Sequence, residues 1–349
     1  MAAAQPVRVR QLYPEVRYEP VLPVNYEASG NDKFEIDGSY YMRSGIELQE
    51  FRDVTLYPCG FLQRGLKIIE PPVHRTLRAW RTPMGRLRRL ANHLVKRPKE
   101  RYDSAVWITD SLSRNYFHWI TEAVPRLYVA RDYYGALPPL LLPDWAERRQ
   151  FVLQSLSQFN ISNIKILRSK GHCNSLLVPW LGDKASVPNR ELMNRVREFY
   201  LTRINSHTSS SYPDRIYVSR ARAGRRGIAN ETAVVETLRK ARFEIVYFEE
   251  HPFEEQVRIA SNARVLVSPH GAGLANLLFM SPGSSVLEIR RRNSRHFMYF
   301  NLAVSQGINY YYQNCGVCGV DHDHAADLVV DCDMLERNIE KSCAPPPPY

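Results

Sequence analysis

An arginine cluster in the second half of the chain has the composition of a phosphate-binding loop. The segment Tyr217–Arg226 reads YVSRARAGRR and directly follows a short apolar run. Guanidinium groups bind phosphate oxygens through paired hydrogen bonds, and they stabilise the charge that a departing diphosphate gains. We therefore predict that Ser219, Arg220, Arg222 and Arg226 bind an anionic ligand. A solvated basic loop is the alternative.

A glycine-rich turn lies further along the chain, after the apolar run 264–268. It consists of His270, Gly271, Ala272, Gly273 and Leu274. In parallel α/β sheets, ligands bind at the carboxyl ends of strands. Glycines let the backbone approach a ligand closely, and amides at a helix start attract phosphate. We predict that this turn holds a diphosphate, with a packing turn as the alternative.

An acidic residue, Glu288, lies within the otherwise apolar segment Val286–Ile289. Acidic residues near strand ends accept hydrogen bonds from ribose hydroxyls in dinucleotide-binding folds. We predict this role for Glu288 beside the same diphosphate-binding turn. The alternative is a strand residue held by a salt bridge.

A third group of polar residues lies in the first half of the chain. His118 and Glu122 are four positions apart, so a helix would place them on one face. Histidine can take a proton from a hydroxyl group near neutral pH, so we predict His118 as catalytic base, with Glu122 as the alternative. Asn115, Trp119 and Arg126 are predicted to bind the acceptor. A structural histidine packed beside the tryptophan is the other interpretation.

Residues near the C-terminus match metal-binding patterns only loosely. They are Asp321-His322-Asp323, Asp331-Cys332-Asp333, and Cys315 and Cys318 with His322 and His324. The acidic pairs follow the last expected strand, and the cysteine pair lacks a second pair of similar spacing, so we expect no metal site. Asp331 or Asp333 is expected to cap the last helix instead. The six cysteines are too sparse for a disulfide framework, and we expect free thiols.

Alternating strands and helices are expected to position these residues. In the first half we expect strands at 105–109, 139–142, 164–167 and 175–178, and helices at 116–134, 144–159 and 189–205. In the second half we expect strands at 215–218, 243–248, 264–268, 285–289 and 309–312, and helices at 230–241, 252–262, from the glycine-rich turn to 280, 296–306 and 333–341. Pro125 predicts a kink or a helix start. The second alternation is typical of a Rossmann-like domain.

Composition changes suggest where the domains end. The start of the chain is irregular and β-rich, with a hairpin expected from 54–56 and 66–69 around a turn at 59–65. A serine-rich stretch that ends in proline is the best linker. The predicted parts are a β-rich segment at 1–80, a Rossmann-like domain at 81–207, a linker at 208–213, a second Rossmann-like domain at 214–342 and a disordered tail at 343–349.

The overall charge favours anionic partners. Lysine plus arginine outnumber aspartate plus glutamate by 47 to 36, a formal net charge of +11. Nucleic acid, anionic lipid and phosphorylated substrates all fit this balance. No apolar run reaches the roughly 20 residues of a membrane span, so we expect the cytoplasm or the inner face of a membrane. A basic helix at Leu87–Val95 suggests peripheral contact with an anionic membrane; packing on the first domain is the alternative.

Five pieces of the chain together resemble glycosyltransferase family 61, which includes bacterial capsular polysaccharide biosynthesis proteins. The pieces are Asn115–Leu127, Ile216–Glu231, Phe253–Gln256, Pro269–Asn276 and Pro282–Glu288, and the resemblance covers roughly residues 50–335. It implies the GT-B fold, in which two Rossmann-like domains face a cleft. It also implies an inverting reaction without a metal or other cofactor.

The resemblance further implies the substrates. The donor would be a nucleotide sugar, typically a UDP-sugar such as UDP-GlcNAc or a UDP-pentose, and the acceptor a glycan or a lipid-linked glycan. Ser219, Arg220, Arg226, Gly271–Gly273 and Glu288 would fall in the donor site. The role of His118 is a hypothesis within this scheme. The sequence does not identify the sugar, the linkage or the oligomeric state.

Two other functions remain open from the residues themselves. A basic nucleic-acid-binding protein fits the charge, but the basic residues do not alternate with aromatics as in known modules, so no nucleic-acid partner is expected. A catalytically inactive scaffold with the same fold is the second alternative. A dinucleotide-dependent oxidoreductase fits poorly, because the glycine-rich turn follows the third expected strand of its domain and the full Gly-x-Gly-x-x-Gly pattern is missing.

Overall fold

The chain forms two compact units of α/β structure. The first comprises residues 1–16 and 43–185, and the second comprises residues 17–42 and 186–349. The computed structural model describes residues 6–17, 21–26, 42–43, 45–65, 67–69, 98–182, 188–204, 212–224, 226–292, 294–318 and 326–344. The basic segment at Leu87–Val95, the acidic pair Asp321–Asp323 and the end of the tail, 345–349, lie outside these residues. Among the described helices, none is long and apolar enough to cross a membrane.

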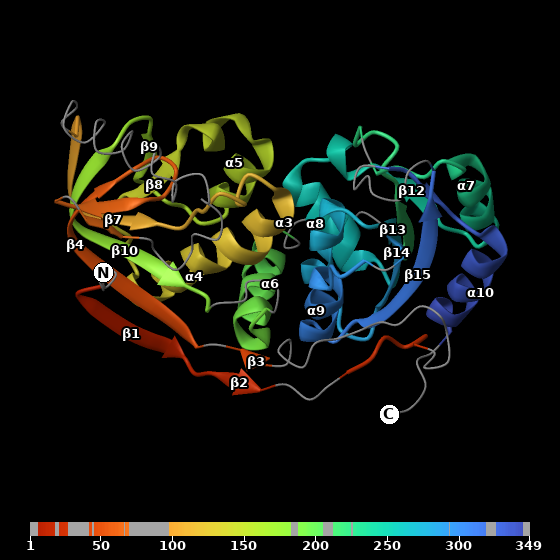
Figure 1. Cartoon of the computed structure of the whole chain (residues 1–349). Helices are drawn as coiled ribbons and strands as arrows, with labels where there is room; N and C mark the ends of the chain where they lie inside the picture. The colour runs from red at the N-terminus through yellow and green to blue at the C-terminus, as the bar shows by residue number, and fades with distance from the viewer. Residues whose placement is uncertain are drawn as a thin grey trace. The chain divides into compact units, whose positions relative to one another are not determined.

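The first unit is built on one mixed eight-stranded sheet (Figure 1). Its order is β6-β5-β4-β10-β7-β8-β9, and β1 pairs with β4. The strands are β1 (Arg8–Tyr13), β4 (Ile46–Leu56), β5 (Leu62–Arg64), β6 (Lys67–Ile69), β7 (Glu100–Trp107), β8 (Leu140–Pro143), β9 (Ile164–Leu167) and β10 (Gly171–Trp180). Strands β7 to β10 are parallel to one another, in the order β9-β8-β7-β10, so the winding direction reverses beside β7. In open parallel sheets, a ligand binds at such a reversal.

The N-terminal segment does not stand apart from this sheet. Strand β4 is antiparallel to β10 over nearly its whole length, and side chains such as Phe51 and Leu176 share one buried core. The expected hairpin also differs. Leu62 and Gln63 lie within the predicted turn 59–65, yet they form β5 and pair with both β4 and β6. Two tight turns, at Gly60 and Gly65, each with positive φ, replace the single long turn.

The expected helix 116–134 is interrupted. It consists of α3 (Tyr116–His118), the π-helical turn η2 (Trp119–Ala123) and α4 (Val124–Tyr134). Pro125 explains the change, because proline has no amide hydrogen to donate to the carbonyl of Thr121 four residues earlier. Pro125 lies in the first turn of α4, where that loss is tolerated. Single π turns of this kind occur often at functional sites.

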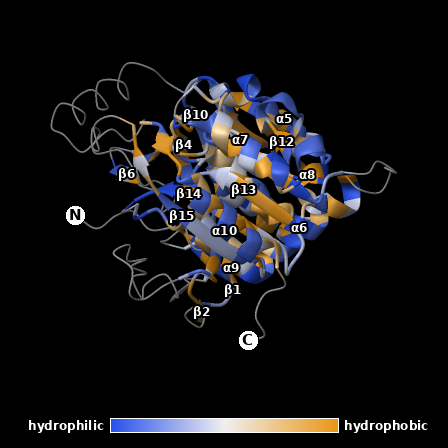
Figure 2. Ribbon diagram, turned by 90° about the vertical axis from the view of Figure 1, so that its right-hand side faces the viewer, coloured by the Kyte–Doolittle hydropathy of each residue, from blue (hydrophilic) through white to orange (hydrophobic). Residues whose placement is uncertain are grey.

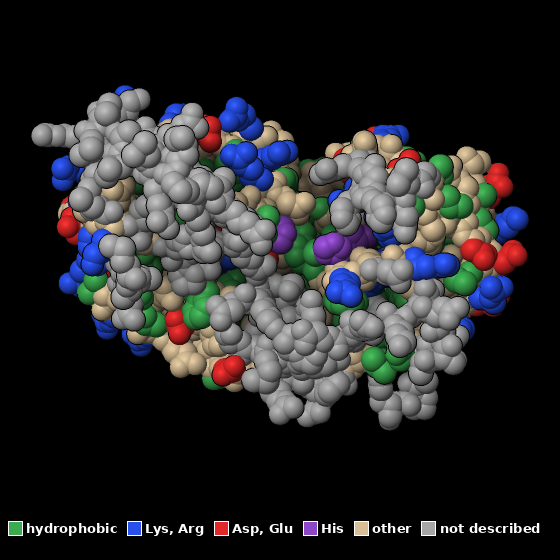
Figure 3. Space-filling view, viewed as in Figure 1, with side chains coloured by type: hydrophobic (Ala, Val, Ile, Leu, Met, Phe, Trp, Pro, Cys, Tyr) green, Lys and Arg blue, Asp and Glu red, His purple; other side chains and the backbone are tan. Residues whose placement is uncertain are grey.

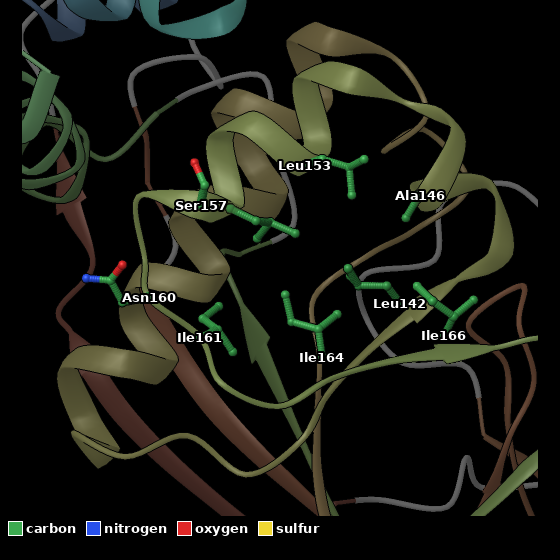
Figure 4. A pocket seen from close by; sticks show the side chains of 9 residues that line it. Leu142, Ala146, Leu153, Ser157, Asn160, Ile161, Ile164 and Ile166 are labelled. Atoms are coloured by element: carbon green, nitrogen blue, oxygen red, sulfur yellow. The ribbon is translucent and has the colours of Figure 1, made fainter.

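A small apolar pocket lies beside the edge strand β9. It has a volume of about 220 Å³ and is lined mainly by aliphatic side chains from β8, β9, η3 (Asp144–Arg148) and α5 (Gln150–Ser157). Figure 4 shows Leu153 on one side of the pocket and Leu142, Ile164 and Ile166 on the other. None of the predicted site residues lines it.

The helix expected at 144–159 differs from the prediction. It consists of the 3₁₀ turn η3 followed by the shorter α-helix α5.

The second unit is a three-layer α/β structure (Figure 1). The sheet order is β12-β11-β13-β14-β15-β16, with β11 to β15 parallel and β16 antiparallel. Its strands are β11 (Arg215–Val218), β12 (Glu244–Val246), β13 (Val265–Pro269), β14 (Ser285–Arg291), β15 (Asn309–Val317) and β16 (Leu328–Val329). Its helices are α6 (Arg190–Ile204), α7 (Glu231–Lys240), η5 (Phe248–Glu250), α8 (Phe253–Asn262), η6 (Ala272–Phe279), α9 (Met298–Ser305) and α10 (Cys332–Cys343).

The central strands of the second unit are buried on both faces. All five residues of β13 are buried, and Figure 2 shows this strand as hydrophobic. Side chains of α7 and α10, such as Leu238 and Leu335, share one core with Tyr217 and Leu287 from the sheet. An apolar strand covered on both faces is typical of parallel sheets. The predicted alternation of strands and helices in this half is confirmed.

Helix α6 belongs to the second unit, whereas the sequence placed it in the first domain. Tyr200 is fully buried, and its ring lies 5.1 Å from the ring of Phe253 and 5.8 Å from that of Phe279. The units therefore divide at 185/186, before α6 rather than in the segment 208–213. Serine and proline mark a break between helix and strand, but aromatic packing decides which core the helix joins.

A short N-terminal stretch also packs on the second unit. Val24 lies against its core, and the Asn25 side chain donates hydrogen bonds to the carbonyl of Tyr312 (2.8 Å) and to Asn338 (3.2 Å). The amide of Tyr312 in turn donates to Asn25 Oδ1 at 3.1 Å. Residues near the start of the chain thus complete the edge of β15. Nothing in the local sequence 21–26 indicates this long-range pairing.

Candidate functional site

The two predicted phosphate-binding motifs lie side by side at the reversal point of the second sheet. Strands β11 and β13 are neighbours, and they are followed by Ser219 and by His270 respectively. The strand order reverses between them: β12 lies on the far side of β11, whereas β14 and β15 lie on the far side of β13. Ser268 Oγ donates to the carbonyl of Val218 at 3.0 Å, which ties the two strand ends together. Ligands bind at this position in doubly wound folds.

Arg220 lies directly over Gly271. A Cβ atom placed on Gly271 would lie 2.6 Å from Cζ of Arg220 and 2.9 Å from its Cδ, closer than real side chains approach. The Nε of Arg220 also donates to the carbonyl of Arg226 at 3.3 Å, and Arg226 adopts a positive φ of 57°. The glycine is therefore needed so that the guanidinium can cross the glycine-rich turn. The first arginine of the cluster and this turn form one structure.

Replacing Gly271 by alanine is expected to weaken binding of the nucleotide donor that the sequence resemblance implies, without unfolding the protein. The added methyl group must displace the Arg220 guanidinium, whereas the backbone at Gly271 has an ordinary extended conformation with φ −178°. We expect the Kd for the nucleotide to rise about tenfold or more, the value of one hydrogen bond to a charged group. Titration calorimetry with UDP measures the change.

Gly316→Ala is the matched control for this substitution, because a Cβ there meets nothing within 4 Å. It should leave the affinity unchanged. An unaltered Kd in Gly271→Ala would show that the position of Arg220 over the turn does not matter for binding.

Ser219 and Arg222 are engaged with protein groups. Ser219 is buried, its hydroxyl donates to Glu231 Oε1 at 2.5 Å, and its Oγ accepts from the amide of Ala221 at 3.1 Å. Arg222 pairs with Glu250 and lies 4.2 Å above the ring of Tyr247. Ser219 thus shapes the loop, and Arg222 is held away by its carboxylate partner. Of the predicted arginines, Arg220 lies over the glycine-rich turn, and Arg226 accepts a hydrogen bond from Arg220 through the backbone carbonyl.

Glu288 does not present a free oxygen to a ribose. Its side chain is fully buried, one carboxylate oxygen bonds His270 Nδ1, and the other accepts from the hydroxyl of Tyr310. Burial by itself raises the pKa of Glu288, but the neighbouring His270 and Arg290 outweigh it and hold the pKa below its ordinary value. The structure therefore joins Glu288 to His270 as a supporting carboxylate, and the predicted ribose contact stays a prediction.

The rest of the turn is a 3₁₀ helix. The Leu274 amide donates to the carbonyl of Gly271 at 3.0 Å, and the Leu274 side chain is fully buried, so this amide is not available to a phosphate. Gly273 packs closely, because a Cβ there would lie 3.3 Å from Val218 and 3.4 Å from Phe248. Ala272 and Gly273 are partly exposed. The accessible residues of the predicted turn are therefore His270, Ala272 and Gly273, whereas Gly271 is buried beneath Arg220.

The first unit carries a second polar group where β7 ends. Asp110 Oδ1 accepts hydrogen bonds from the amides of Leu112 (2.9 Å) and Ser113 (3.0 Å) and from the Ser113 hydroxyl (3.0 Å). Burial alone raises the pKa of Asp110, but Arg126 and the bonds from Ser113 outweigh burial, so the pKa lies below its ordinary value. The sequence analysis missed Asp110. Its signal was a carboxylate directly after an apolar strand.

His118 is supported by a buried chain of charges. Its Nδ1 lies 2.9 Å from Oε1 of Glu122, and its side chain is 18% exposed while that of Glu122 is 1% exposed. Arg126 lies behind them, with Nη2 3.7 Å from Glu122 Oε2 and 3.5 Å from Asp110 Oδ2. Histidine side chains reach the surface on the face shown in Figure 3. A carboxylate on Nδ1 fixes the imidazole and leaves Nε2 as the reactive nitrogen.

The three predicted acceptor-binding residues have structural partners. Asn115 Oδ1 accepts from the Phe117 amide at 2.9 Å and caps α3. Trp119 is fully buried, and its indole donates to Ser155 Oγ at 2.8 Å. Arg126 is buried and donates to the carbonyl of Ile108 at 3.0 Å. Trp119 and Arg126 therefore hold the helix that carries His118 rather than facing a ligand, and the exposed Asn115 sets where that helix begins.

Asp331 and Cys315, two of the residues singled out near the C-terminus, lie in ordinary structural positions. Asp331 accepts from the Met334 amide at 2.9 Å and caps α10, as predicted. Burial raises the pKa of the Cys315 thiol to about 12, so this sulfur stays protonated. The six cysteines form no disulfide. Within the described part of the chain, no three acidic, histidine or cysteine side chains gather as metal ligands would.

Comparison with known proteins identifies the family. Residues 116–287 match the family model described as Glycosyltransferase 61. This range includes His118, Arg220 and the glycine-rich turn. The chain contains a glycosyltransferase family 61 domain. Protein O-linked-mannose beta-1,4-N-acetylglucosaminyltransferase 2 of Homo sapiens is 33% identical to it over 130 residues, 34% of this chain and 22% of that protein. The Mus musculus protein of the same name gives the same identity and coverage.

The match spans about a fifth of the length of these relatives, so it identifies the glycosyltransferase core and not the remainder of either protein. The α/β fold of this family 61 enzyme agrees with the sequence prediction. Members of the family transfer sugars from nucleotide donors to glycan acceptors in general. The enzyme class predicted from the sequence is confirmed.

Proposed function

We propose that this enzyme moves a sugar from a UDP donor to a hydroxyl group of a glycan or lipid-linked acceptor, in one inverting step that needs no metal. The observation that carries the proposal is Arg220, held over Gly271 at the reversal point of the second sheet. A guanidinium beside a glycine-rich turn is suited to a diphosphate. Surface polysaccharide synthesis is the proposed setting.

The donor diphosphate would lie against 270–273, with Arg220 and Arg226 beside it. These guanidinium groups would stabilise the negative charge on the departing diphosphate, the task that a divalent cation performs in other transferases. Ser219 would shape the loop through Glu231. Arg222 would stay with Glu250 and take no part.

His118 would act as the catalytic base. Glu122 accepts only, so the proton on the imidazole lies on Nδ1, and Nε2 can take the proton of the acceptor hydroxyl. The hydroxyl oxygen then bonds to the anomeric carbon as the bond to the diphosphate breaks, which inverts the configuration. Of the two open candidates, Glu122 is the less suitable base because its carboxylate is buried behind the imidazole.

UDP-N-acetylglucosamine is the donor we propose first. The relatives are named as N-acetylglucosaminyltransferases, and the similarity to them includes 33% identity over 130 residues.

We also propose the two-domain GT-B fold. Each unit has parallel strands, and each holds its group of polar residues where its own strand order reverses. That position is the ligand side of such sheets.

Thermal denaturation in the presence of nucleotides tests this function. UDP and UDP-N-acetylglucosamine at about a hundred times Kd should raise the stability by about 2.7 kcal/mol and therefore raise Tm. The shift should persist with EDTA. An unchanged Tm with millimolar UDP would contradict the donor site, and a shift abolished by EDTA would contradict metal independence. Salt-dependent binding of nucleic acid without any response to UDP would favour the alternative function.

A further inference from the structure

His270 is held on several sides by side chains of the second unit. Its Nδ1 contacts Glu288 on β14, and the second oxygen of that carboxylate accepts from Tyr310 on β15. The ring of Tyr299 on α9 lies 5.0 Å away, edge to face, and the ring of His296 lies 5.8 Å away. The His270 side chain is nevertheless 16% exposed. The imidazole is thus held by its neighbours and remains partly accessible.

The buried charges around His270 determine which protons it carries. Glu288 is ionised and can only accept, so Nδ1 carries a proton and Nε2 is the remaining nitrogen. Arg290, on the same strand, is the other cation beside Glu288. Burial and the charge of Glu288 raise the pKa of Tyr310, so it remains a hydrogen-bond donor and adds no negative charge. A neutral imidazole would offer only a lone pair at Nε2, whereas an imidazolium would donate there.

Groups suited to bind an anion lie next to His270. Gly271 follows His270 in the chain and is covered by the Arg220 guanidinium, whose Nε donates to the carbonyl of Arg226. A buried carboxylate that makes a hydrogen bond with an imidazole stabilises its protonated form. Phosphate, which offers only acceptors when fully ionised, selects the same form.

We infer that His270 binds the donor diphosphate as an imidazolium ion, with Glu288 as its positioning residue and Arg220 as the adjacent cation. This inference rests on the proposed UDP site. It gives the site a pH dependence: binding is strong while His270 is protonated and weakens as the pH rises and the imidazolium loses its proton. Arg220 keeps its charge throughout, so part of the affinity remains at high pH.

The test compares the UDP affinity of the wild-type protein and His270→Gln across pH. Glutamine retains a neutral hydrogen-bond donor but carries no charge. Titration calorimetry from about pH 5.5 to 9.5 brackets the ordinary titration of histidine, which has a pKa of about 6.5, and extends above it. The Kd ratio of variant to wild type should be about 10 to 100 at the low end and fall towards one at the high end. The titration of UDP itself is common to both proteins and cancels in this ratio.

Two further variants keep the test decisive. Glu288→Gln removes the carboxylate that stabilises the imidazolium. As the pH rises, the UDP affinity of this variant should therefore fall at a lower pH than that of the wild-type protein. This comparison provides a readout even when His270→Gln fails to fold. His172→Gln, in the first unit, changes a histidine paired with Asp53 at 3.4 Å and should leave the Kd ratio at one. Circular dichroism and Tm establish the fold of each.

The outcomes separate this inference from the proposed function. A Kd ratio that stays constant across pH, or equals one throughout, overturns the imidazolium assignment while UDP binding itself stands. An identical pH profile in Glu288→Gln and the wild type overturns the role of Glu288. Failure of the wild-type protein to bind UDP at any pH overturns the UDP site and this inference together.

Discussion

Arg220→Ala is expected to lower turnover about a hundredfold or more, because it removes a cation from the departing diphosphate. One well-placed group of this kind contributes about 2.7–4 kcal/mol in the transition state. The guanidinium lies over Gly271 at the end of β13, where a diphosphate would meet the turn. Its loss should reduce kcat more than it raises the Kd of UDP, since the diphosphate gains its charge as the bond breaks. Steady-state kinetics with UDP-N-acetylglucosamine and calorimetry with UDP measure the two effects.

Arg222→Ala is the control for this substitution. The two arginines are two positions apart in the same loop and have the same charge, but Arg222 pairs with Glu250 and lies over the ring of Tyr247. We expect turnover to change by less than about threefold, as for an exposed ion pair. Near-normal turnover in folded Arg220→Ala, or equal losses in both variants, would show that the loop contributes only its overall charge.

His118→Ala is expected to have an effect of similar size, but through the acceptor hydroxyl rather than through the departing diphosphate. Loss of a general base lowers kcat by a factor of about 10² to 10⁴. UDP affinity should be unchanged, since the predicted donor-binding residues all lie in the second unit. Glu122→Gln should also lower kcat, because an amide can turn its nitrogen to Nδ1 and favour the wrong imidazole tautomer.

His172→Ala is the matched control in the same unit. This histidine is similarly exposed, at 17%, and is also paired with a carboxylate, but that carboxylate, Asp53, is 80% exposed rather than buried. Its replacement should leave kcat unchanged. Retained turnover in His118→Ala with intact UDP binding would assign the base to another group, and loss of UDP binding would show that the two units are coupled.

The sequence predicted the elements of the second unit well, for a physical reason. Each strand there is a short apolar run between helices with one polar face, and both patterns are local properties of the chain. The arginine cluster and the glycine-rich turn were found in the same way, since each directly follows such a strand. Boundaries of β11 agree, and α10 begins beside its predicted cap Asp331.

The first unit was harder to predict because its sheet depends on distant pairing. Strand β4 is eleven residues long and pairs with β1, β5 and β10. Buried and exposed residues do not alternate regularly along it, because both of its faces are partly buried. The π turn at Trp119–Ala123 depends on Pro125, which the sequence marked only as a kink or a helix start. Only the tertiary structure shows that Pro125 begins α4 after a π turn.

The sequence by itself determined the types of group present: a histidine one helical turn from a carboxylate, a loop of arginines, and glycines after an apolar strand. It did not determine which of these groups face a ligand. Ser219, Arg222, Trp119 and Arg126 fitted a ligand site by type and position, but each is already engaged with a protein group. Glu288 fitted a ribose contact, and its carboxylate supports His270. Partners such as Tyr310 and Ser155 lie 22 and 36 residues away in the chain, and only folding brings their side chains close enough to use the hydrogen-bonding capacity that the sequence left open.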